Sequence, residues 1–331
     1  MKAVRIHAHG GPDALRYEDV ELAPPGPGQA QVRHTAIALN FSDVNVRRGG
    51  FYQSEPMPMP LIPGNEAAGV VEAVGPDVAD VKPGDRVAYV GMHGPFYRDT
   101  GAYAQARNVP ASRLVHVPAD VTDEQACALL LKGATAATIV ERVFPPRAGH
   151  VILVHAAASG VGLLLTQWAA HLGAQVIGTV GSQAKADVAR AHGAAHAILY
   201  RERDFVAAVK EIAPEGVDAV YDGVGKDTFV RSFDCVRPFG TLVNYGNASG
   251  HVPPIDMIDL AQKGSLSICR PAVSFYLKDS ALRATAQRLF DLVARGVLRV
   301  EIAARYRLED AAQAHRDLEA GLRAGSIVLL P

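Results

Sequence analysis

Short runs of alternating apolar and polar residues fill the first third of the chain. They read MKAVRIHA, AQVRHTAIAL, EAAGVVEAVG and DRVAYVG, and the Pro- and Gly-rich segments APPGPGQ, PMPMPLIPG and VKPGD separate them. Alternation with a period of two is typical of half-buried β-strands, and Pro and Gly mark the turns between strands. This part of the sequence therefore predicts a barrel-like or sandwiched β domain.

The pattern changes beyond residue 124. VILVHA (151–156) is a continuous apolar run, the helical stretch LLLTQWAAHLG follows it, and apolar runs and helical stretches then alternate as far as GTLVNYG. Apolar strands that alternate with helices predict a doubly wound parallel sheet, and so an α/β fold overall. We expect the C-terminal strands and helices to return to the first domain, because chain termini commonly lie close together.

The loop HAAASGVG (155–162) joins the first of these strands to its helix. A dinucleotide fingerprint needs small residues there for a tight turn and for close approach to a pyrophosphate, which the helix N-terminus attracts. We therefore predict that the loop binds a dinucleotide through Ala158, Ser159, Gly160, Val161 and Gly162. As an alternative, Ser159 is a nucleophile, but the branched Val161 does not suit the strained G-x-S-x-G elbow.

The residues after the second strand indicate which nicotinamide cofactor is bound. An NAD site usually places an acidic residue about 20 positions past the loop. Here those positions hold Gly181 and Ser182, followed by Lys185, and the next strand ends at Tyr200 and Arg201. Hydroxyl, ammonium and guanidinium groups suit a 2′-phosphate, so the sequence favours NADPH. The alternative is that Lys185 only solvates a helix face.

Composition narrows the class of protein. A chain of 331 residues suggests two domains, and its net charge of −1 gives no reason to expect nucleic acid or an anionic membrane as partner. We expect neither a signal peptide nor a membrane span. The three cysteines are far apart, which predicts a reducing, cytoplasmic location rather than a disulfide framework.

Several motifs together resemble one known family. They include ALNFSDVNVRRG, PLIPGNEAAGVVEAVG, LLLKGATAAT, HAAASGVG, VYDGVGKDTF, NYGNASG and KGSLSICRP, and they run nearly from end to end. In order and spacing they resemble the zinc-independent quinone oxidoreductases of the medium-chain dehydrogenase/reductase superfamily, the group that includes zeta-crystallin. The resemblance implies a GroES-like catalytic domain (1–124 and 268–331) and a Rossmann NADP-binding domain (125–267).

The resemblance also assigns roles to residues. It implies that Asn40 and Asp43 border the nicotinamide and the substrate, that Tyr52 lines the quinone pocket, and that Thr135 lies beside the nicotinamide. Asn45 departs from the family, since it stands where bacterial enzymes have a second pocket tyrosine. The implied cofactor residues are Gly181, Lys185, Tyr200, Tyr245 and Asn247.

The zinc ligands of the related alcohol dehydrogenases are replaced in this chain. Gly64, Asn65 and Glu66 stand at the position of the GHE stretch that supplies a zinc-binding histidine, and Asn is a poor zinc ligand. We therefore predict no metal site. The role of Lys132 stays open: it is a cation of the cleft, it caps a helix, or it pairs with a carboxylate.

These observations predict NADPH-dependent reduction of quinones by hydride or electron transfer without a metal. One alternative is reduction of the C=C bond of α,β-unsaturated carbonyls, which zinc-free relatives perform. Another is a non-enzymatic, crystallin-like or RNA-binding role, which the balanced charge does not favour. The expected partners are a small-molecule quinone or enone and a second copy of the chain, because relatives pair through the strand that corresponds to SLSICRP.

Overall fold

The computed structural model describes residues 1–49, 57–91, 99–277 and 281–331. Two compact units divide the chain: one comprises Met1–Ala134, Ser274–Arg295 and Val300–Pro331, and the other Thr135–Val273 and Gly296–Arg299. The boundaries inferred from the sequence lie at 124/125 and 267/268, whereas the contacts place them after Ala134 and after Val273. Each unit is described by itself below.

The first unit is a β domain. Over its described residues a seven-stranded sheet has the order β14-β15-β3-β4-β5-β7, and β6 pairs with β3 on a side branch. The strands of this sheet are β3 (Gln29–Leu39), β4 (Glu66–Val74), β5 (Arg86–Val90), β6 (Ala106–Pro110), β7 (Val115–His116), β14 (Ile302–Arg307) and β15 (Ser326–Leu330). A separate antiparallel pair consists of β1 (Lys2–Arg5) and β2 (Arg16–Asp19).

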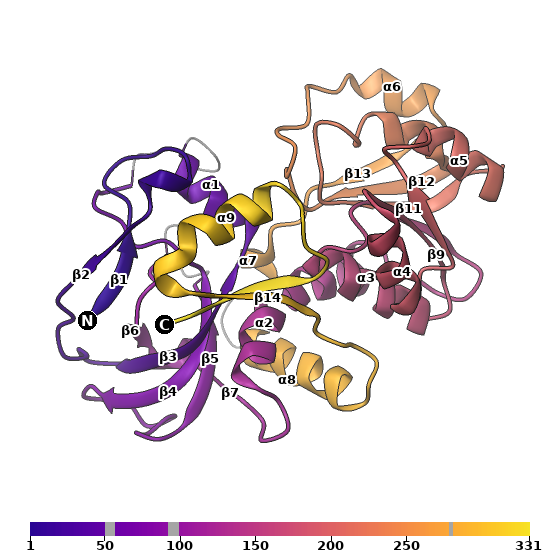
Figure 1. Cartoon of the computed structure of the whole chain (residues 1–331). Helices are drawn as coiled ribbons and strands as arrows, with labels where there is room; N and C mark the ends of the chain where they lie inside the picture. Colours follow the sequence, from indigo (N-terminus) through magenta and orange to yellow (C-terminus); the bar gives the residue numbers. More distant parts are fainter. Residues whose placement is uncertain (50–56, 92–98, 278–280) are drawn as a thin grey trace. The chain divides into compact units, whose positions relative to one another are not determined.

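The C-terminal strand of the chain lies in this sheet beside an early strand. β15 pairs antiparallel with β3, so the last strand lies directly beside a strand from the first forty residues (Figure 1). The helices of this unit are α1 (Phe41–Arg48), α8 (Ala281–Ala294) and α9 (Ala311–Glu319). Apolar residues of β3, β4 and β15, including Ile37, Val71 and Leu329, form a core on which α9 packs through Ala314. The described C-terminal residues Val300–Pro331 thus belong to the first unit.

The second unit contains a six-stranded sheet, all parallel, with the order β10-β9-β8-β11-β12-β13. Its strands are β8 (Val151–Val154), β9 (Gln175–Val180), β10 (His196–Leu199), β11 (Val217–Asp222), β12 (Val236–Asn244) and β13 (Ser267–Cys269). In chain order this arrangement is 3-2-1-4-5-6, the doubly wound order of dinucleotide-binding folds. The α/β fold expected from the alternation is therefore confirmed.

Helices surround this parallel sheet. They are α3 (Gly160–His171), α4 (Gln183–Ala191), α5 (Phe205–Ile212) and α6 (Met257–Gln262). Two further helices, α2 (Asp123–Thr138) and α7 (Val273–Tyr276), extend across the unit boundaries. The central strands are buried on both faces, which is why Leu153, Val220 and Leu242 belong to continuous apolar runs. In the described part of the chain, no helix has both the length and the apolar character that crossing a membrane requires.

Candidate functional site

The first candidate group of residues lies at the start of α1. Asn40 is the N-cap residue of this helix, and its backbone N–H donates to Asp43 Oδ2 at 2.8 Å. An Asn followed three residues later by a carboxylate is a variant of the capping box, so the sequence NFSD itself starts the helix here. This local bond brings together two residues predicted to border the nicotinamide and the substrate, and both of them are buried.

Asp43 accepts hydrogen bonds from several directions. The Asn65 side-chain amide donates to Asp43 Oδ1, and the Tyr103 hydroxyl lies 3.3 Å from Oδ2. Complete burial raises the pKa of Asp43 to about 7, and the nearby Glu66 carboxylate acts in the same direction, while the Asn40 N–H opposes it. The carboxyl is therefore buried, surrounded by donors, and able to change its charge near neutral pH.

Glu66 is the centre of a second, adjoining cluster. Its Oε1 accepts from Asn40 Nδ2 at 2.8 Å and from Lys132 Nζ at 3.2 Å, and its Oε2 accepts from the backbone N–H of Leu131 at 2.7 Å. The Glu66 side chain is fully buried and that of Lys132 is nearly so. Of the three roles that the sequence allows for Lys132, the structure shows pairing with a carboxylate, that of Glu66. The pair holds the Asn40 amide in one orientation.

The glycine loop has the geometry that a dinucleotide requires. Ser159 is the N-cap of α3, and its hydroxyl accepts from the backbone N–H of Gly162 at 3.1 Å. A Cβ at Gly162 would lie 2.2 Å from the carbonyl oxygen of Ala156, so the helix can approach the strand only with glycine here. Ala158 is buried, and Gly160 and Val161 begin the helix. The remaining free N–H groups of a helix start form a site for an anion.

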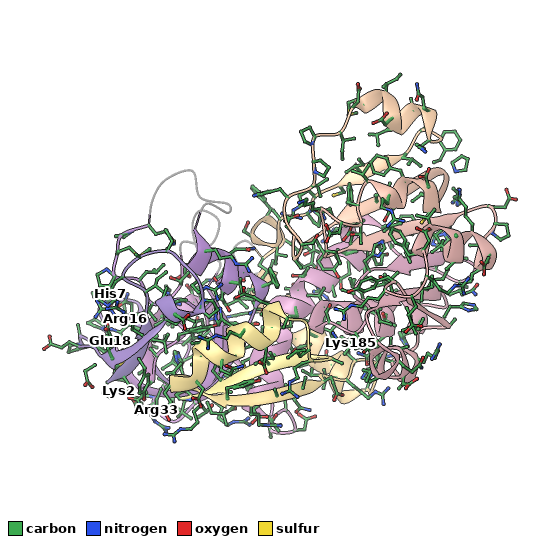
Figure 2. The ribbon with its side chains drawn as sticks, turned by 45° about the horizontal axis from the view of Figure 1, so that its top comes forward. Lys2, His7, Arg16, Glu18, Arg33 and Lys185 are labelled. Carbon is green, nitrogen blue, oxygen red and sulfur yellow. The ribbon has the colours of Figure 1, made fainter. Side chains whose placement is uncertain are left out.

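The ends of β9 and β10 bring the predicted phosphate-binding residues together. A Cβ at Gly181 would lie 3.2 Å from the Tyr200 hydroxyl and 3.4 Å from Arg201 Nε, so both groups lie over the glycine. Ser182 is the N-cap of α4, and Lys185, labelled in Figure 2, lies in the first turn of this helix. Burial and the positive charge of Arg201 both lower the pKa of Lys185. Two cations that repel each other are stabilised by a dianion between them.

Tyr245 and Asn247 follow the end of β12. The Tyr245 hydroxyl is buried beside Ser159, and among the described residues it makes no hydrogen bond of good geometry. A Cβ at Gly223 would lie 2.6 Å from a carbon of the Tyr245 ring. Asn247 Oδ1 accepts from Arg270 Nη1 at 3.3 Å. A buried hydroxyl without a partner is costly unless a ligand supplies one. The glycine loop, the cations Lys185 and Arg201 and the Tyr245 hydroxyl are together the kinds of groups that NADPH needs.

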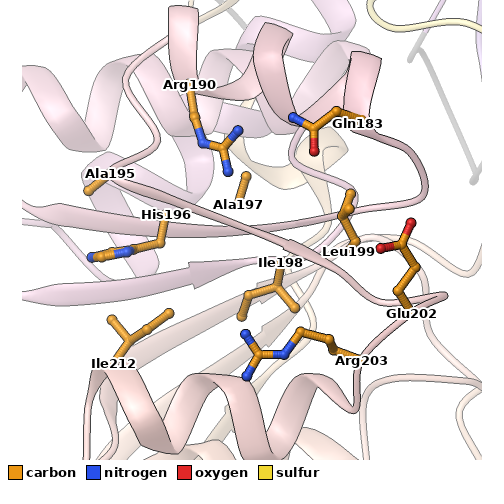
Figure 3. A pocket seen from close by; sticks show the side chains of 10 residues that line it. All are labelled: Gln183, Arg190, Ala195, His196, Ala197, Ile198, Leu199, Glu202, Arg203 and Ile212. Atoms are coloured by element: carbon orange, nitrogen blue, oxygen red, sulfur yellow. The ribbon is translucent and has the colours of Figure 1, made fainter.

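A hollow of about 350 Å³ also lies in this unit, beside the edge strand β10 (Figure 3). Its lining comes from α4, from β10 and the residues on either side of that strand, and from α5: Gln183, Arg190, Ala195, His196, Ala197, Ile198, Leu199, Glu202, Arg203 and Ile212. None of the residues predicted to bind the cofactor lines it. The hollow is therefore separate from the residues predicted to bind the cofactor.

Comparison with known proteins places this geometry in a family. Residues 26–119 match the alcohol dehydrogenase GroES-like domain, and residues 160–292 match the zinc-binding dehydrogenase domain. The chain is 45% identical to a quinone oxidoreductase of Pseudomonas aeruginosa over 100% of this chain and 99% of the relative. The chain belongs to the quinone oxidoreductase family.

Two other proteins are similar to the chain over its full length. The crystal structure of the Escherichia coli quinone oxidoreductase complexed with NADPH has a TM-score of 0.94, 39% identity and full coverage of both chains. A 2-haloacrylate reductase from Burkholderia is 43% identical over 100% of this chain and 99% of its own. The family recognised from the sequence motifs is confirmed.

The donor set of this quinone oxidoreductase family member does not fit the zinc of the zinc-binding dehydrogenases. Asn65, at the position of their histidine, uses its Nδ2 to donate to Asp43 and, at 3.1 Å, to Ser42 Oγ. Both oxygens of Glu66 already accept bonds from within the chain. The described residues contain no group of three or more His, Cys, Asp and Glu side chains arranged to hold a metal. The side chains at this position are therefore bonded to one another and do not form a set of zinc ligands.

The remaining predicted residues are located as follows. Tyr52 lies outside the described residues. Thr135 is half-buried on α2, one turn after Lys132, and is the first residue of the second unit. Sequence reasoning assigned no role to Tyr103 or Glu66, because neither belongs to a local motif with Asp43. The isolated GNE triplet was the only signal for Glu66.

Proposed function

We propose that the chain catalyses NADPH-dependent reduction of quinones. The observation that carries the cofactor choice is the convergence of Gly181, Lys185, Tyr200 and Arg201 at the ends of β9 and β10. The choice of a quinone as substrate rests on the relatives, since the Pseudomonas aeruginosa and Escherichia coli proteins are named quinone oxidoreductases. The Escherichia coli structure is a complex with NADPH. The proposed cofactor residues are those predicted from the sequence.

The proposed chemistry needs little from the protein beyond positioning. NADPH, when bound, supplies a hydride. A quinone is electron-poor and becomes a stabilised aromatic anion on accepting that hydride, so the chain's task is to orient the two reactants and exclude water. Asn40 suits the orienting role, because the bond from its Nδ2 to Glu66 fixes the orientation of its side-chain amide, including the amide oxygen. Asp43 holds the Asn40 backbone in turn.

Exchange of the charge at Lys185 tests the cofactor choice. Lys185→Glu places a carboxylate where a 2′-phosphate is proposed, so kcat/KM for NADPH should fall by at least roughly tenfold while that for NADH changes little. Lys210→Glu on α5 changes the net charge equally on an exposed face and is the matched control. Equal losses with NADPH and NADH in the Lys185 variant would refute the phosphate site.

Reduction of an α,β-unsaturated acid or carbonyl is the second candidate. The full-length similarity to a 2-haloacrylate reductase favours it, since a haloacrylate carries a C=C bond conjugated to a carboxylate. Both reactions need the same cofactor and an electron-poor acceptor. Turnover of a quinone relative to a 2-alkenal and a 2-haloacrylate distinguishes them.

An RNA-binding role finds less support than catalysis. The side chains labelled on the first unit in Figure 2 include Lys2 and Arg33, which pair with Asp19 at 2.8 Å and Glu72 at 2.9 Å, and the imidazole of His7, which lies 3.0 Å from Glu18. Paired charges do not make the basic stripe that a phosphate backbone needs. A salt-sensitive gel shift with RNA at physiological ionic strength would restore that role.

We also propose that the protein forms a homodimer in a reducing compartment. β13 is an edge strand of the parallel sheet. In the single chain its Ile268 side chain is 36% exposed, and pairing of this edge with a second copy would cover it. The free Cys127, Cys235 and Cys269 suit a reducing cytoplasm. Light scattering of the purified protein measures the mass, and a monomer at micromolar concentration would refute the dimer.

A further inference from the structure

A line of buried polar groups continues from Asp43 away from Asn40. The Tyr103 hydroxyl, 3.3 Å from Asp43 Oδ2, is also 3.0 Å from His315 Nε2, and His315 Nδ1 is 3.0 Å from Arg47 Nη1. The side chains of Tyr103, His315 and Arg47 are all fully buried within the first unit. They come from the segment before β6, from α9 and from α1, so three distant parts of the chain meet behind Asp43.

Arg47 fixes the direction of every bond in this line. A guanidinium can only donate, so His315 Nδ1 must accept. Burial, together with the positive charges of Arg47 and Arg48, lowers the pKa of His315 to about 3, so the ring is neutral and its one proton is on Nε2. Nε2–H then donates to the Tyr103 oxygen, and the Tyr103 proton is left for Asp43 Oδ2.

The outer end of the line is fixed as well. Arg47 forms an ion pair with Glu319 of α9 at 2.6 Å, and its Nε donates to the carbonyl oxygen of Gly10 at 3.1 Å. The Glu319 side chain is 17% exposed, so the line starts near the surface and ends at the buried carboxyl. Because a guanidinium does not release its proton at ordinary pH, the line orients groups and does not conduct protons.

Asp43 is held as an acceptor by all its described hydrogen-bond partners. Asn40 N–H and the Tyr103 hydroxyl donate to Oδ2, and the Asn65 amide donates to Oδ1. The charged groups that face it are Glu66 on β4 and Lys132 on α2, with Arg47 on its own helix beyond Tyr103. Protonation of this carboxyl weakens the bonds that the three donors make to it, and two of those donors are the backbone N–H of Asn40 and the side-chain amide of Asn65.

We propose that His315 and Tyr103 are positioning residues of the reductase site, which hold Asp43 as the acceptor that fixes Asn40 and Asn65. The inference rests on the proposed function, since Asn40 is taken to orient the reactants. Neither His315 nor Tyr103 touches Asn40 itself, and both act through Asp43. The active form of the site is the one in which the Asp43 carboxyl is ionised.

The first unit contains a matched control for this arrangement. Tyr89 and His34 form a second buried hydroxyl–imidazole pair, also with Oη 3.0 Å from Nε2, and His34 Nδ1 bonds to the carbonyl oxygen of Ala104 at 2.7 Å. Both side chains are buried to a similar degree as the first pair. Neither residue of this pair is among the groups that bond to Asp43. Tyr89→Phe therefore removes a similar buried bond, together with the interaction of its hydroxyl with Arg107, without changing the donors to the carboxyl.

The pH dependence of quinone reduction separates positioning from a purely structural role. Tyr103→Phe removes one donor to the ionised carboxyl, so the acid limb of kcat/KM should move to higher pH by about one unit. Activity at pH 6 then falls several-fold more than activity at pH 8.5, while Tyr89→Phe keeps the parent's limb. An unmoved limb in Tyr103→Phe, or an equal shift in both variants, overturns the proposal.

Two substitutions of His315 supply a rescue. His315→Gln keeps an amide N–H near the position of Nε2 and should keep the parent's acid limb, whereas His315→Leu should move it as Tyr103→Phe does. Identical limbs in the two His315 variants contradict the proposal. Because His315→Leu removes a buried polar group that Arg47 needs, Tyr103→Phe carries the test if that variant does not fold.

A readout without turnover distinguishes failure of this inference from failure of the proposed function. ¹⁵N NMR of the imidazoles in the parent protein, with His315 assigned by its absence in His315→Gln, should show Nε2 protonated and Nδ1 bare from pH 6 to 8. A proton on Nδ1 overturns the line of donors whatever the enzyme reduces. The expected tautomer in a protein that reduces no quinone would refute the function and leave the geometry standing.

Discussion

Replacement of Asp43 by asparagine should change how the stability of the protein depends on pH. Burial raises the pKa of Asp43 to about 7 from the ordinary value of 3.8. A carboxyl with a raised folded-state pKa favours folding through its protonated form, so its contribution is fully present below pH 4 and is lost as the pH rises through 7. From below pH 4 to above pH 7, Asp43 lowers the free energy of unfolding by about 4 kcal/mol in total, and about 2.5 kcal/mol of this falls between pH 5 and pH 8.

The amide introduced by Asp43→Asn does not titrate, so the variant should lack this loss. The free energy of unfolding of the parent relative to the variant should therefore decrease by about 2.5 kcal/mol from pH 5 to pH 8. Urea unfolding of both proteins at equal concentration measures this difference. The buried histidines His34, His155 and His315, whose lowered pKa values make stability rise with pH, contribute equally to both proteins and drop out of the difference. Parallel pH curves for parent and variant would refute the reasoning.

Two further predictions concern Lys132 and Ser159. Lys132→Met leaves the fully buried Glu66 without its cation and should cost about 3–5 kcal/mol of unfolding free energy. Adding Glu66→Gln to the same chain should restore part of that loss. A loss under about 1 kcal/mol in urea unfolding would show that the pair is not desolvated. Ser159→Ala removes the cap of α3 and should cost about 1 kcal/mol of unfolding free energy while turnover at saturating NADPH persists, whereas complete loss of that turnover in a folded variant would show that the hydroxyl does more than cap the helix.

The sequence predicts the parts of this structure that local spacing determines. VILVHA, HAAASGVG and the alternation after them specify the parallel sheet, because a strand, a tight loop and a helix start are each encoded within a few residues. Asn40 and Asp43 are visible for the same reason, since they are three residues apart at one helix start. The cations after the second and third strands follow from the rule that parallel strands end at one edge of a sheet.

The partners behind Asp43 could not be predicted in this way. Tyr103 is 60 residues from Asp43, and His315 is 268 residues from Arg47. Their contacts depend on how β15 pairs with β3 and on how α9 packs over that sheet, and neither is encoded by a local period. Lys132 illustrates the limit, because its sequence allowed three roles and only the fold brought Glu66 to it.

Oxidation of NADPH by the purified protein tests the central claim most directly. An ortho-quinone, a para-quinone, a 2-alkenal and a 2-haloacrylate are compared as acceptors, with NADH in parallel and a chelator present throughout. The account predicts rapid, chelator-resistant oxidation of NADPH by a quinone and little oxidation of NADH. Turnover of the alkenal or haloacrylate alone would contradict the quinone assignment, and loss of activity with the chelator would contradict chemistry without a metal.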